Sequence, residues 1–555
     1  MRAHVLALVA LGLAALACSS SKPKGADADA DGAPPPDAEA SGAAGADAAA
    51  DLAPTPDADA AADRAAAPDA DAAAEASGAG GALGMAGPND VLTRNGSETR
   101  QGFFIQPRLT FGALSKMGPD TGFQASFTGS MYASPLYVEN GPRGKGAFFA
   151  ATTSNVVYAL DETTGAVLWM HAIGEAPAVT GAGCGNVKPV GITSTPVIDP
   201  RTRTIFVAGG VGTTQIDRHE IHALSLDDGA ERAGWPVNVS ALQDPTGLAF
   251  NTVAQNQRSA LSLVNGVLYV AYGGHAGDCN TYHGWIVAVD TTSPTRVGAW
   301  ATGGVGEGIW AAGGMASDGT SVFAATGNRL PDGATHQDSE EIVRVTGLAQ
   351  VDRSTGVFYP ASWRTMDQQD QDMASSSPVV LTVPGATPAT IVAAASKDGH
   401  LFLLDPKNLG GMGAPLLDLR IATTDTIRSP LSAYVSPAGA HVLVNTLAGG
   451  PCSPTVPSLA SYIVTPTNPP KLDQAWCFAS GSNGGAIATT SDGTHDPVVW
   501  VLNGGINAIN GDVGTLVYNG LNGPCLGAHA FSAPIAVKGR IIASADNRLC
   551  SWSSH

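Results

Sequence analysis

Basic residues are scarce in this 555-residue sequence, which holds 29 Lys and Arg against 48 Asp and Glu and has a formal net charge of −19. About half of the excess negative charge lies between residues 19 and 78, so the rest of the chain is only mildly acidic. Proteins bind a phosphate backbone through clustered Lys and Arg side chains, and the sequence has no such stripe. The composition therefore argues against a nucleic-acid partner.

Charged residues of both signs are also few, at 14% of the chain, whereas glycine and proline number 68 and 37. Such a composition suits short strands joined by tight turns better than it suits helices. We therefore interpret the folded part of the chain as all-β.

Adjacent cysteines, CxxC and CxxCH are all absent, which argues against a structural zinc site and a c-type haem. Beyond Cys18 there are six cysteines, an even number that in an exported protein suggests three disulfides. Two pairs share a separation of 25 residues, and buried reduced thiols are the alternative. The expected pairs are Cys452 with Cys477, Cys525 with Cys550, and Cys184 with Cys279.

The apolar run from Val5 to Ala17 is too short to span a bilayer as a mature helix. It ends in Ala15-Leu16-Ala17-Cys18, which resembles the lipobox of bacterial lipoproteins, with Ala15 where Leu is usual. The resemblance implies a signal peptide at residues 1–18, lipid attachment at Cys18 and, because Ser19 follows, sorting to the outer membrane. An ordinary signal peptide is the alternative.

Residues 19–90 consist mostly of Ala, Asp, Pro and Gly, with almost no aromatic or β-branched side chains. Such a segment cannot bury enough apolar surface to offset its chain entropy. We expect a disordered tether at 19–90 and a folded domain at 91–555.

A repeat appears in the folded domain. Its clearest copy has apolar runs at 133–137, 147–152 and 156–161, and a turn at Thr164-Gly165 leads to Trp169. The runs are typical of the strands of a four-stranded antiparallel sheet, which needs neighbours to cover its faces. Small residues at repeated offsets, with a terminal Trp, suit a docking contact between neighbouring sheets.

Eight copies of the repeat can be counted, which predicts an eight-bladed β-propeller; seven blades is the alternative. The last copy has room for about three strands, so we expect the segment around 92–109 to supply the fourth and close the ring. The copies begin near Met131, Ile192, Arg258, Trp310, Met373, Arg428, Gly484 and His529.

The pattern Ala-x-Asp-x-x-Thr-Gly-x-x-x-Trp at Ala159 to Trp169 resembles the signature of the pyrroloquinoline-quinone (PQQ) repeat family, and the resemblance covers about 131–552. It implies the propeller fold. It does not imply a cofactor, because many proteins with these repeats carry none and serve as binding scaffolds.

Within the repeats, two segments 18 residues apart resemble those of PQQ-dependent alcohol dehydrogenases. Gly308-Ile309-Trp310 is similar to the segment whose Trp stacks under the quinone, and Thr326-Gly327-Asn328 to the turn whose Asn ligates calcium. A flat indole supports a planar cofactor, and an amide oxygen is a hard ligand for calcium. The resemblance implies that Trp310 binds PQQ and that Asn328 binds the metal.

Further along, the run from Asp367 to Asp372 resembles the segment that holds the family's catalytic base, with Asp367 and Asp370 as the two candidates. Lys397 resembles the basic residue that contacts the quinone. The family also has adjacent cysteines over the quinone and a calcium-ligating Glu after a glycine pair. Here no cysteines are adjacent, and Val211 follows the glycine pair.

A second cluster, around Cys279, comprises Arg258, His275, Asp278, Tyr282, His283 and Trp285. Two histidines eight residues apart can bind a metal, but no firm third ligand accompanies them. We therefore expect a polar loop that is held in place by a disulfide.

Two functions follow. The anchor, the long tether and the missing catalytic parts favour a binding scaffold for a protein or cell-envelope polymer, periplasmic or surface-exposed, that touches the membrane only through its lipid. The chain also resembles the smaller propeller lipoprotein of the outer-membrane assembly machinery. The alternative is a PQQ- and calcium-dependent oxidoreductase with a degenerate site, carried by Trp310, Asn328, Asp367 or Asp370, and Lys397.

Overall fold

The structure is a computed structural model that describes residues 86–331, 333–423, 426–479, 484–502, 505–521, 525, 528–529 and 531–554. The expected signal peptide, lipidated Cys18 and tether up to residue 85 lie outside the described residues. Within these described ranges, no helix is long and apolar enough to cross a membrane.

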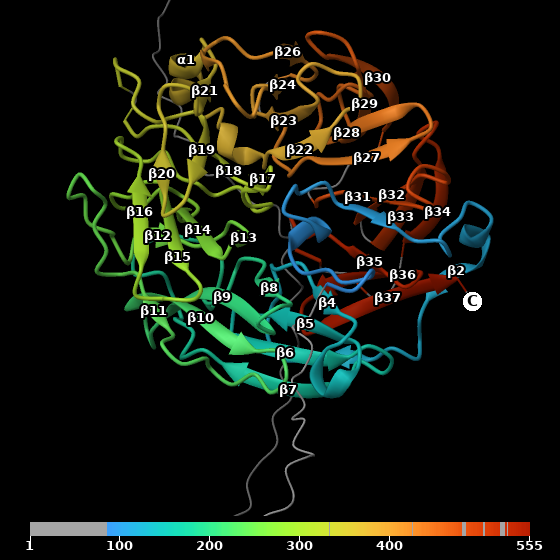
Figure 1. The fold of residues 1–555 in the computed structure, drawn as a ribbon, viewed down its shortest axis with the longest axis horizontal. Coiled ribbons are helices and arrows are strands. Elements are labelled where there is room, and N and C mark those ends of the chain that lie inside the picture. Colours follow the sequence, from blue (N-terminus) through green and yellow to red (C-terminus); the bar gives the residue numbers. More distant parts are fainter. Residues whose placement is uncertain are drawn as a thin grey trace, which may run out of the picture.

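Eight antiparallel sheets form a ring of blades around a central channel, which confirms the predicted eight-bladed propeller (Figure 1). The first strand of each blade lines the channel and starts a few residues after the repeat start expected from the sequence. Blades 1 to 4 consist of β4 (Leu136–Val138), β5 (Ala147–Ala151), β6 (Val156–Asp161) and β7 (Val167–Ala172); β8 (Val197–Asp199), β9 (Thr204–Val211), β10 (Arg218–Ser225) and β11 (Val237–Asn238); β13 (Ser262–Val264), β14 (Val267–Gly274), β15 (Trp285–Asp290) and β16 (Val297–Ala301); and β17 (Ala316–Ser317), β18 (Val322–Ala325), β19 (Ile342–Thr346) and β21 (Val357–Tyr359).

Blades 5 to 8 repeat this arrangement. They consist of β22 (Val379–Thr382), β23 (Thr390–Ala395), β24 (His400–Leu404) and β26 (Leu417–Arg420); β27 (Ser432–Ser436), β28 (Gly439–Thr446), β29 (Ser458–Thr465) and β30 (Lys471–Phe478); β31 (Ile487–Thr490), β32 (Val498–Leu502), β33 (Gly505–Asn510) and β34 (Leu516–Leu521); and β35 (Ile535–Val537), β36 (Arg540–Ala545), β37 (Arg548–Ser554) and β2 (Met117–Pro119).

Short elements complete the blades. The added strands are β1 (Phe103–Ile105), β3 (Ala125–Ser126), β12 (Gln255–Asn256), β20 (Gln350–Val351) and β25 (Gly411–Met412). One α-helix, α1 (Trp363–Gln369), leads into blade 5, and the 3-10 turns are η1 (Arg94–Gly96), η2 (Ala113–Lys116), η3 (Pro142–Gly144) and η4 (Met373–Ser375).

Tryptophans on outer strands dock neighbouring blades, as the repeat pattern suggests. The Trp169 indole of blade 1 lies against Gly229 of blade 2 and donates its N–H to the Leu226 carbonyl at 2.9 Å. Gly229 has a φ of +74°, and a Cβ there would lie 2.7 Å from the indole. Trp476 of blade 6 docks on Gly514 of blade 7 in the same way. A glycine is needed at each contact because the ring packs directly on the backbone.

Ring closure corrects one sequence-based expectation. The fourth strand of blade 8 is β2, which pairs with β37 beside the C-terminus, rather than a strand within 92–109 (Figure 1). The only part of 92–109 that forms a strand is β1, which runs parallel to β31 on the inner edge of blade 7. The expected closure by the N-terminal part of the domain is therefore correct, but the closing strand lies further along the chain.

Residues 91–106, the channel segment, instead line the channel and hydrogen-bond to all eight blades in order. Its side chains have no sheet period, because the segment passes from one inner strand to the next and pairs over several residues only with β31. The contacts are Val91 with Tyr137, Leu92 with Ile198, Glu98 with Leu263 and Ser317, Thr99 with Val380, Gln101 with Ala433, Gly102 with Ala488, and Gln106 with Ala536 and Gly539.

Antiparallel pairing gives the ring two different faces. The turns between first and second and between third and fourth strands form one face, here the turn face. The loops between second and third strands and the connectors between blades form the other, here the connector face. The chain enters the ring on the turn face, where Asp90 accepts the Glu139 N–H at 2.7 Å and the Asn89 amide donates to the Glu139 carboxylate at 2.8 Å.

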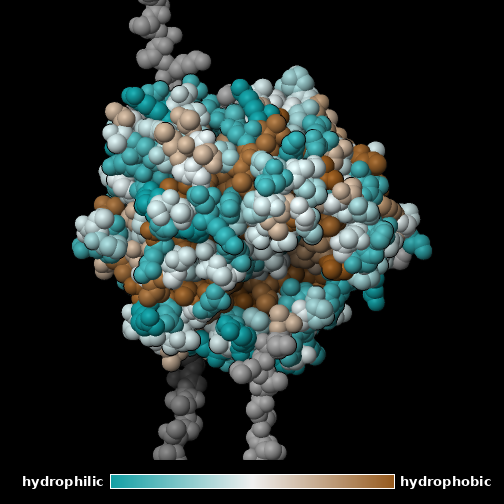
Figure 2. Space-filling model, turned by 45° about the horizontal axis from the view of Figure 1, so that its top comes forward, coloured by the Kyte–Doolittle hydropathy of each residue, from teal (hydrophilic) through white to brown (hydrophobic). Residues whose placement is uncertain are grey.

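The six cysteines of the domain form three disulfides with the pairings expected from the sequence. Cys452–Cys477 lies within blade 6 and Cys525–Cys550 at blade 8. Cys184–Cys279 joins the connector between blades 1 and 2 to a loop of blade 3. The outer surface is largely hydrophilic, and hydrophobic residues occupy smaller areas between polar ones in the view of Figure 2.

Candidate functional site

A cavity of about 210 Å³ opens on the connector face, above the channel segment. We call it the channel pocket. Connectors between blades and loops between second and third strands supply its walls, so residues far apart in the sequence meet there. Its polar and aromatic lining residues include Arg258, Asp278, Tyr282, Trp310, Asn328, Asp370, Asp372, Arg428 and Phe531.

Lys397 lies buried beside the pocket, in the turn between β23 and β24. Its ammonium group is 2.7 Å from an Asp372 carboxylate oxygen and 3.3 Å from an Asp370 oxygen. The same nitrogen lies 5.5 Å from the centre of the Trp310 ring, within cation–π range. A buried ammonium group thus holds two carboxylates on one side of the pocket.

Asn328 belongs to the loop between β18 and β19 and is also nearly buried. Its backbone N–H donates to the other Asp372 carboxylate oxygen at 2.7 Å. The preceding Gly327 lets this loop approach closely, since a Cβ there would lie 3.0 Å from Asp372 and 3.3 Å from the indole nitrogen of Trp310. Asp372 therefore connects the Asn328 loop with Lys397.

The two candidate bases lie in different places. Asp370 follows α1 in a left-handed conformation, with φ of 56°, and lines the pocket. Asp367 is not among the pocket-lining residues; its carboxylate accepts the Arg329 N–H and the Ser339 hydroxyl, both at 3.0 Å. Burial raises the pKa of Asp367 to about 6.

Asp372 belongs to the acidic run in the sequence, but the sequence pattern does not distinguish it as a site residue. Three aspartates within six residues gave no means of choosing, because the choice depends on how the chain leaves α1. A helix of seven residues ending in a left-handed residue turns Asp370 and Asp372 toward Lys397 and leaves Asp367 on the helix.

Buried carboxyl groups beneath the pocket were not found from the sequence. Glu340 is fully buried and accepts the Met373 N–H at 2.6 Å; burial, then the neighbouring Asp372, raises the pKa of Glu340 well above its ordinary range. Glu307 is also fully buried and accepts the Gly304 N–H at 2.7 Å, and burial raises its pKa to about 7. A strand pattern in the sequence does not predict such residues, because their burial depends on how neighbouring blades pack together.

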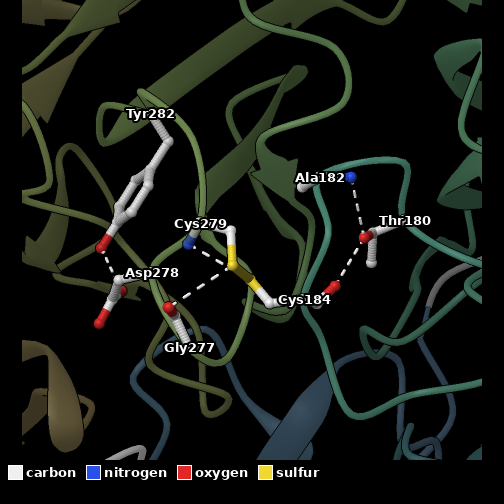
Figure 3. The surroundings of a disulfide bond; sticks show 7 residues. All are labelled: Thr180, Ala182, Cys184, Gly277, Asp278, Cys279 and Tyr282. Carbon is white, nitrogen blue, oxygen red and sulfur yellow. Dashed lines mark hydrogen bonds between the residues drawn. A yellow bond between two sulfur atoms is a disulfide. The ribbon is translucent and has the colours of Figure 1, made fainter. Parts of the chain in front are cut away.

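The loop around Cys279 forms a wall of the pocket (Figure 3). The Tyr282 hydroxyl donates to the Asp278 carboxylate at 2.6 Å, and burial raises the Tyr282 pKa well above its ordinary value. The Cys184 side of the disulfide is held by the Thr180 hydroxyl, which donates to the Cys184 carbonyl at 2.6 Å. Burial lowers the pKa of His275 to about 4, so this pocket residue is neutral at pH 7.

Val211 ends β9, at the position where the resembled dehydrogenases place a calcium-ligating Glu. Its side chain is buried against Gly174, where an added Cβ would lie 2.7 Å from a Val211 methyl carbon. It contributes no oxygen and does not line the pocket.

The residues present do not fit a calcium site. Calcium takes about 6 to 8 oxygen ligands. Among the described residues, no group of three or more His, Cys, Asp or Glu side chains is arranged to hold a metal ion. The Asp370 and Asp372 carboxylates, which line the pocket with Asn328 and Trp310, are already ion-paired with the Lys397 ammonium group.

No protein-family model matches the chain, and no curated protein matches its sequence. Solved structures do match. Quinohemoprotein alcohol dehydrogenase from Comamonas testosteroni has a TM-score of 0.59 at 14% identity, covering 84% of this chain and 80% of that chain. A europium-containing methanol dehydrogenase has a TM-score of 0.56 at 14% identity, covering 84% and 89%.

BamB from Moraxella catarrhalis also matches, with a TM-score of 0.45 at 14% identity, covering 79% of this chain and 99% of that chain. At such identities the likeness to the dehydrogenases concerns the fold alone. The chain therefore has a propeller fold like that of the quinoprotein alcohol dehydrogenases.

Proposed function

We propose that the protein is a lipid-anchored binding scaffold of the cell envelope, whose connector face receives part of a protein or polymer partner. The observation that carries the proposal is the ion pairing of Lys397 with Asp370 and Asp372. A carboxylate that acts as a base must be able to take a proton, and a neighbouring buried ammonium group opposes this. The pocket is therefore better suited to hold a ligand than to transform it.

The path of the chain supports the same function. The domain is entered on the turn face, at Asn89 and Asp90, and the channel pocket opens on the connector face. An anchor at Cys18 would then be joined to the domain through the face opposite the pocket. The connector face is left open to a partner.

Cys18→Ala tests the anchor. We expect the variant to fold but to leave the membrane fraction, because an N-terminal lipid is the proposed membrane contact. Fractionation followed by immunoblotting measures this, and circular dichroism checks the fold. An unchanged membrane fraction would contradict the anchor.

Affinity capture from solubilised envelopes tests the scaffold. We expect the full chain to capture a defined partner and Trp310→Ala to lose it, whereas Lys145→Ala retains it. Lys145 is exposed on the turn face and serves as the matched control. If Trp310→Ala and Lys145→Ala capture equal amounts of the partner, the channel pocket is not the binding site.

A PQQ-dependent oxidoreductase is the second candidate, since Trp310, Asn328, Asp370 and Lys397 all lie at one pocket. Trp310 offers a flat surface and Lys397 a positive charge to a planar quinone, which would supply the electron acceptor for alcohol oxidation. Absorbance and calorimetry with PQQ and calcium test this. Submicromolar, calcium-dependent binding that Asn328→Ala abolishes would favour the enzyme.

A further inference from the structure

Arg94, in the channel segment, is a buried cation with few partners. The side chain is 1% exposed, and among the described residues it donates one hydrogen bond, from a terminal nitrogen to the Phe531 carbonyl. Within the described part of the chain its Nε has no hydrogen-bond partner, and its guanidinium has no carboxylate within ion-pair distance. Burying a charge without a counter-charge is costly, so its retention requires an explanation.

The neighbours of Arg94 increase this positive charge. Burial, followed by the Arg100 and Arg258 guanidiniums, lowers the pKa of Arg94 to about 9, which leaves it charged at pH 7. Arg100 is equally buried but well satisfied, since it hydrogen-bonds to several groups of blades 3 and 4 and lies 3.6 Å from the Glu98 carboxylate. Of these two buried arginines of the channel segment, Arg94 is the one that has no ion-pair partner among the described residues.

Phe531 connects Arg94 with the channel pocket. Its carbonyl accepts the Arg94 hydrogen bond, and its residue lines the pocket. It has a φ of +68°, a left-handed conformation that a bulky residue rarely adopts. The Arg258 guanidinium, which also lines the pocket, lies 5.5 Å from the Phe531 ring centre and 4.8 Å from that of Tyr132. Two guanidiniums therefore contact Phe531, Arg94 at its carbonyl and Arg258 at its ring.

Another part of the lining has a different character. The half-buried Trp310 lines the same pocket, as do Asn186, Asn256 and Asn328. A flat aromatic surface with a few hydrogen-bonding amides suits a ring that carries hydroxyl groups. Guanidinium charge together with an aromatic surface and asparagines in one pocket describes one kind of ligand.

We propose that the channel pocket binds a sugar acid, with its anionic group at Arg258 and its ring against Trp310, and with the buried Arg94 supporting the anionic end through Phe531. This deepens the proposed scaffold function, on which it rests, by identifying the partner as an acidic polysaccharide. Arg258 contacts the anion directly. Arg94 is a positioning residue that supplies the buried counter-charge and fixes the Phe531 backbone.

Calorimetry on the full chain in detergent tests the ligand class, with glucuronate, glucose and inorganic phosphate as probes. Charge-assisted hydrogen bonds lead us to expect glucuronate to bind about tenfold or more tightly than glucose. Binding of glucose as tightly as glucuronate would overturn the proposal. Binding of phosphate without glucuronate would assign the site to a free phosphate ion and overturn the sugar acid.

Variants test the residues. Arg258→Gln should weaken glucuronate binding about tenfold or more, and Arg94→Lys should weaken it too, because an ammonium group lacks the fork of a guanidinium. Lys145→Gln, on the exposed turn face, should leave it unchanged. Circular dichroism monitors folding, and Arg258→Gln remains decisive if Arg94→Lys fails to fold. Unchanged affinity in folded Arg258→Gln would refute the proposal.

Affinity capture separates this inference from the function on which it rests. If the full chain captures a partner that Trp310→Ala loses and Arg258→Gln keeps, the sugar-acid site is wrong and the scaffold stands. If Trp310→Ala captures as much as the unaltered chain, the pocket-based scaffold itself is wrong.

Discussion

Two buried cations lie near the channel pocket and differ in their partners. Lys397 is held by two carboxylates at 2.7 and 3.3 Å, whereas Arg94 has no carboxylate partner within the described ranges. A buried ion pair is a structural unit whose members need each other, while a buried charge without a partner is a cost that the fold carries. The comparison indicates that the ion pairs of Lys397 stabilise the fold. An anionic ligand near Arg94 would supply the counter-charge that this guanidinium lacks among the described residues.

Removing the Lys397 ammonium group should have the largest effect on the free energy of unfolding. Lys397→Met leaves Asp372 buried without its cation, so we expect a loss of about 3 to 5 kcal/mol in the free energy of unfolding. Urea titration followed by tryptophan fluorescence measures this, with Lys145→Met on the exposed turn face as control. Adding Asp372→Asn to Lys397→Met should recover part of the loss. A loss no larger than that of Lys145→Met would show that the pair is not structural.

Glu307 extends the comparison to a buried carboxyl group, for which no ion pair is found within the described residues. Its pKa is about 7 in the fold and near 4.5 when exposed, so between these values the folded state holds a proton that the unfolded chain releases. Its contribution to stability therefore falls by about 3 kcal/mol as pH rises from about 4.5 to 7 and is constant above.

Glu307→Gln should remove this pH dependence, because an amide stays neutral. We expect the variant to match the unaltered chain near pH 4.5 and to be the more stable one at pH 8. Unfolding curves at a series of pH values give the difference. An identical pH profile in both proteins would mean that Glu307 is ionised in the fold at no cost.

Arg94→Met should have the smallest effect on stability. Losing the hydrogen bond to Phe531 and removing a buried unpaired charge act in opposite directions, so the free energy of unfolding should change by less than about 1 kcal/mol. The same urea titration measures it beside Lys397→Met. A loss comparable to that of Lys397→Met would show that the fold already neutralises Arg94.

The repeats made most of the fold predictable. Each repeat start lies a few residues before a channel-lining strand, because the apolar runs and turns are local features. The two cysteine separations of 25 residues likewise reflect partners within or next to one blade. The closing strand was misplaced because β2 has three residues and pairs with a strand more than 400 positions away, which no local pattern records.

The site was only partly predictable. Resemblance identified Trp310, Asn328, Asp370 and Lys397 as candidates, and the structure places three of them on the pocket lining and Lys397 beside it. It could not choose among three neighbouring aspartates, since a single left-handed residue decides which face Lys397. The resemblance also missed Arg94. The segment that contains Arg94 has no repeat pattern, and its contacts are spread over eight blades.

The channel segment has a consequence for the order of folding. Its residues emerge from the ribosome before any blade, yet its last partner, the N–H of Gly539, is 433 residues beyond Gln106. The segment can complete its circuit only after the eighth blade exists. Pairing over such sequence separations is slow, because the chain between must be ordered first. The earliest part of the domain to be synthesised is thus among the last to reach its native position. The channel segment can connect all eight blades only after the final blade has formed.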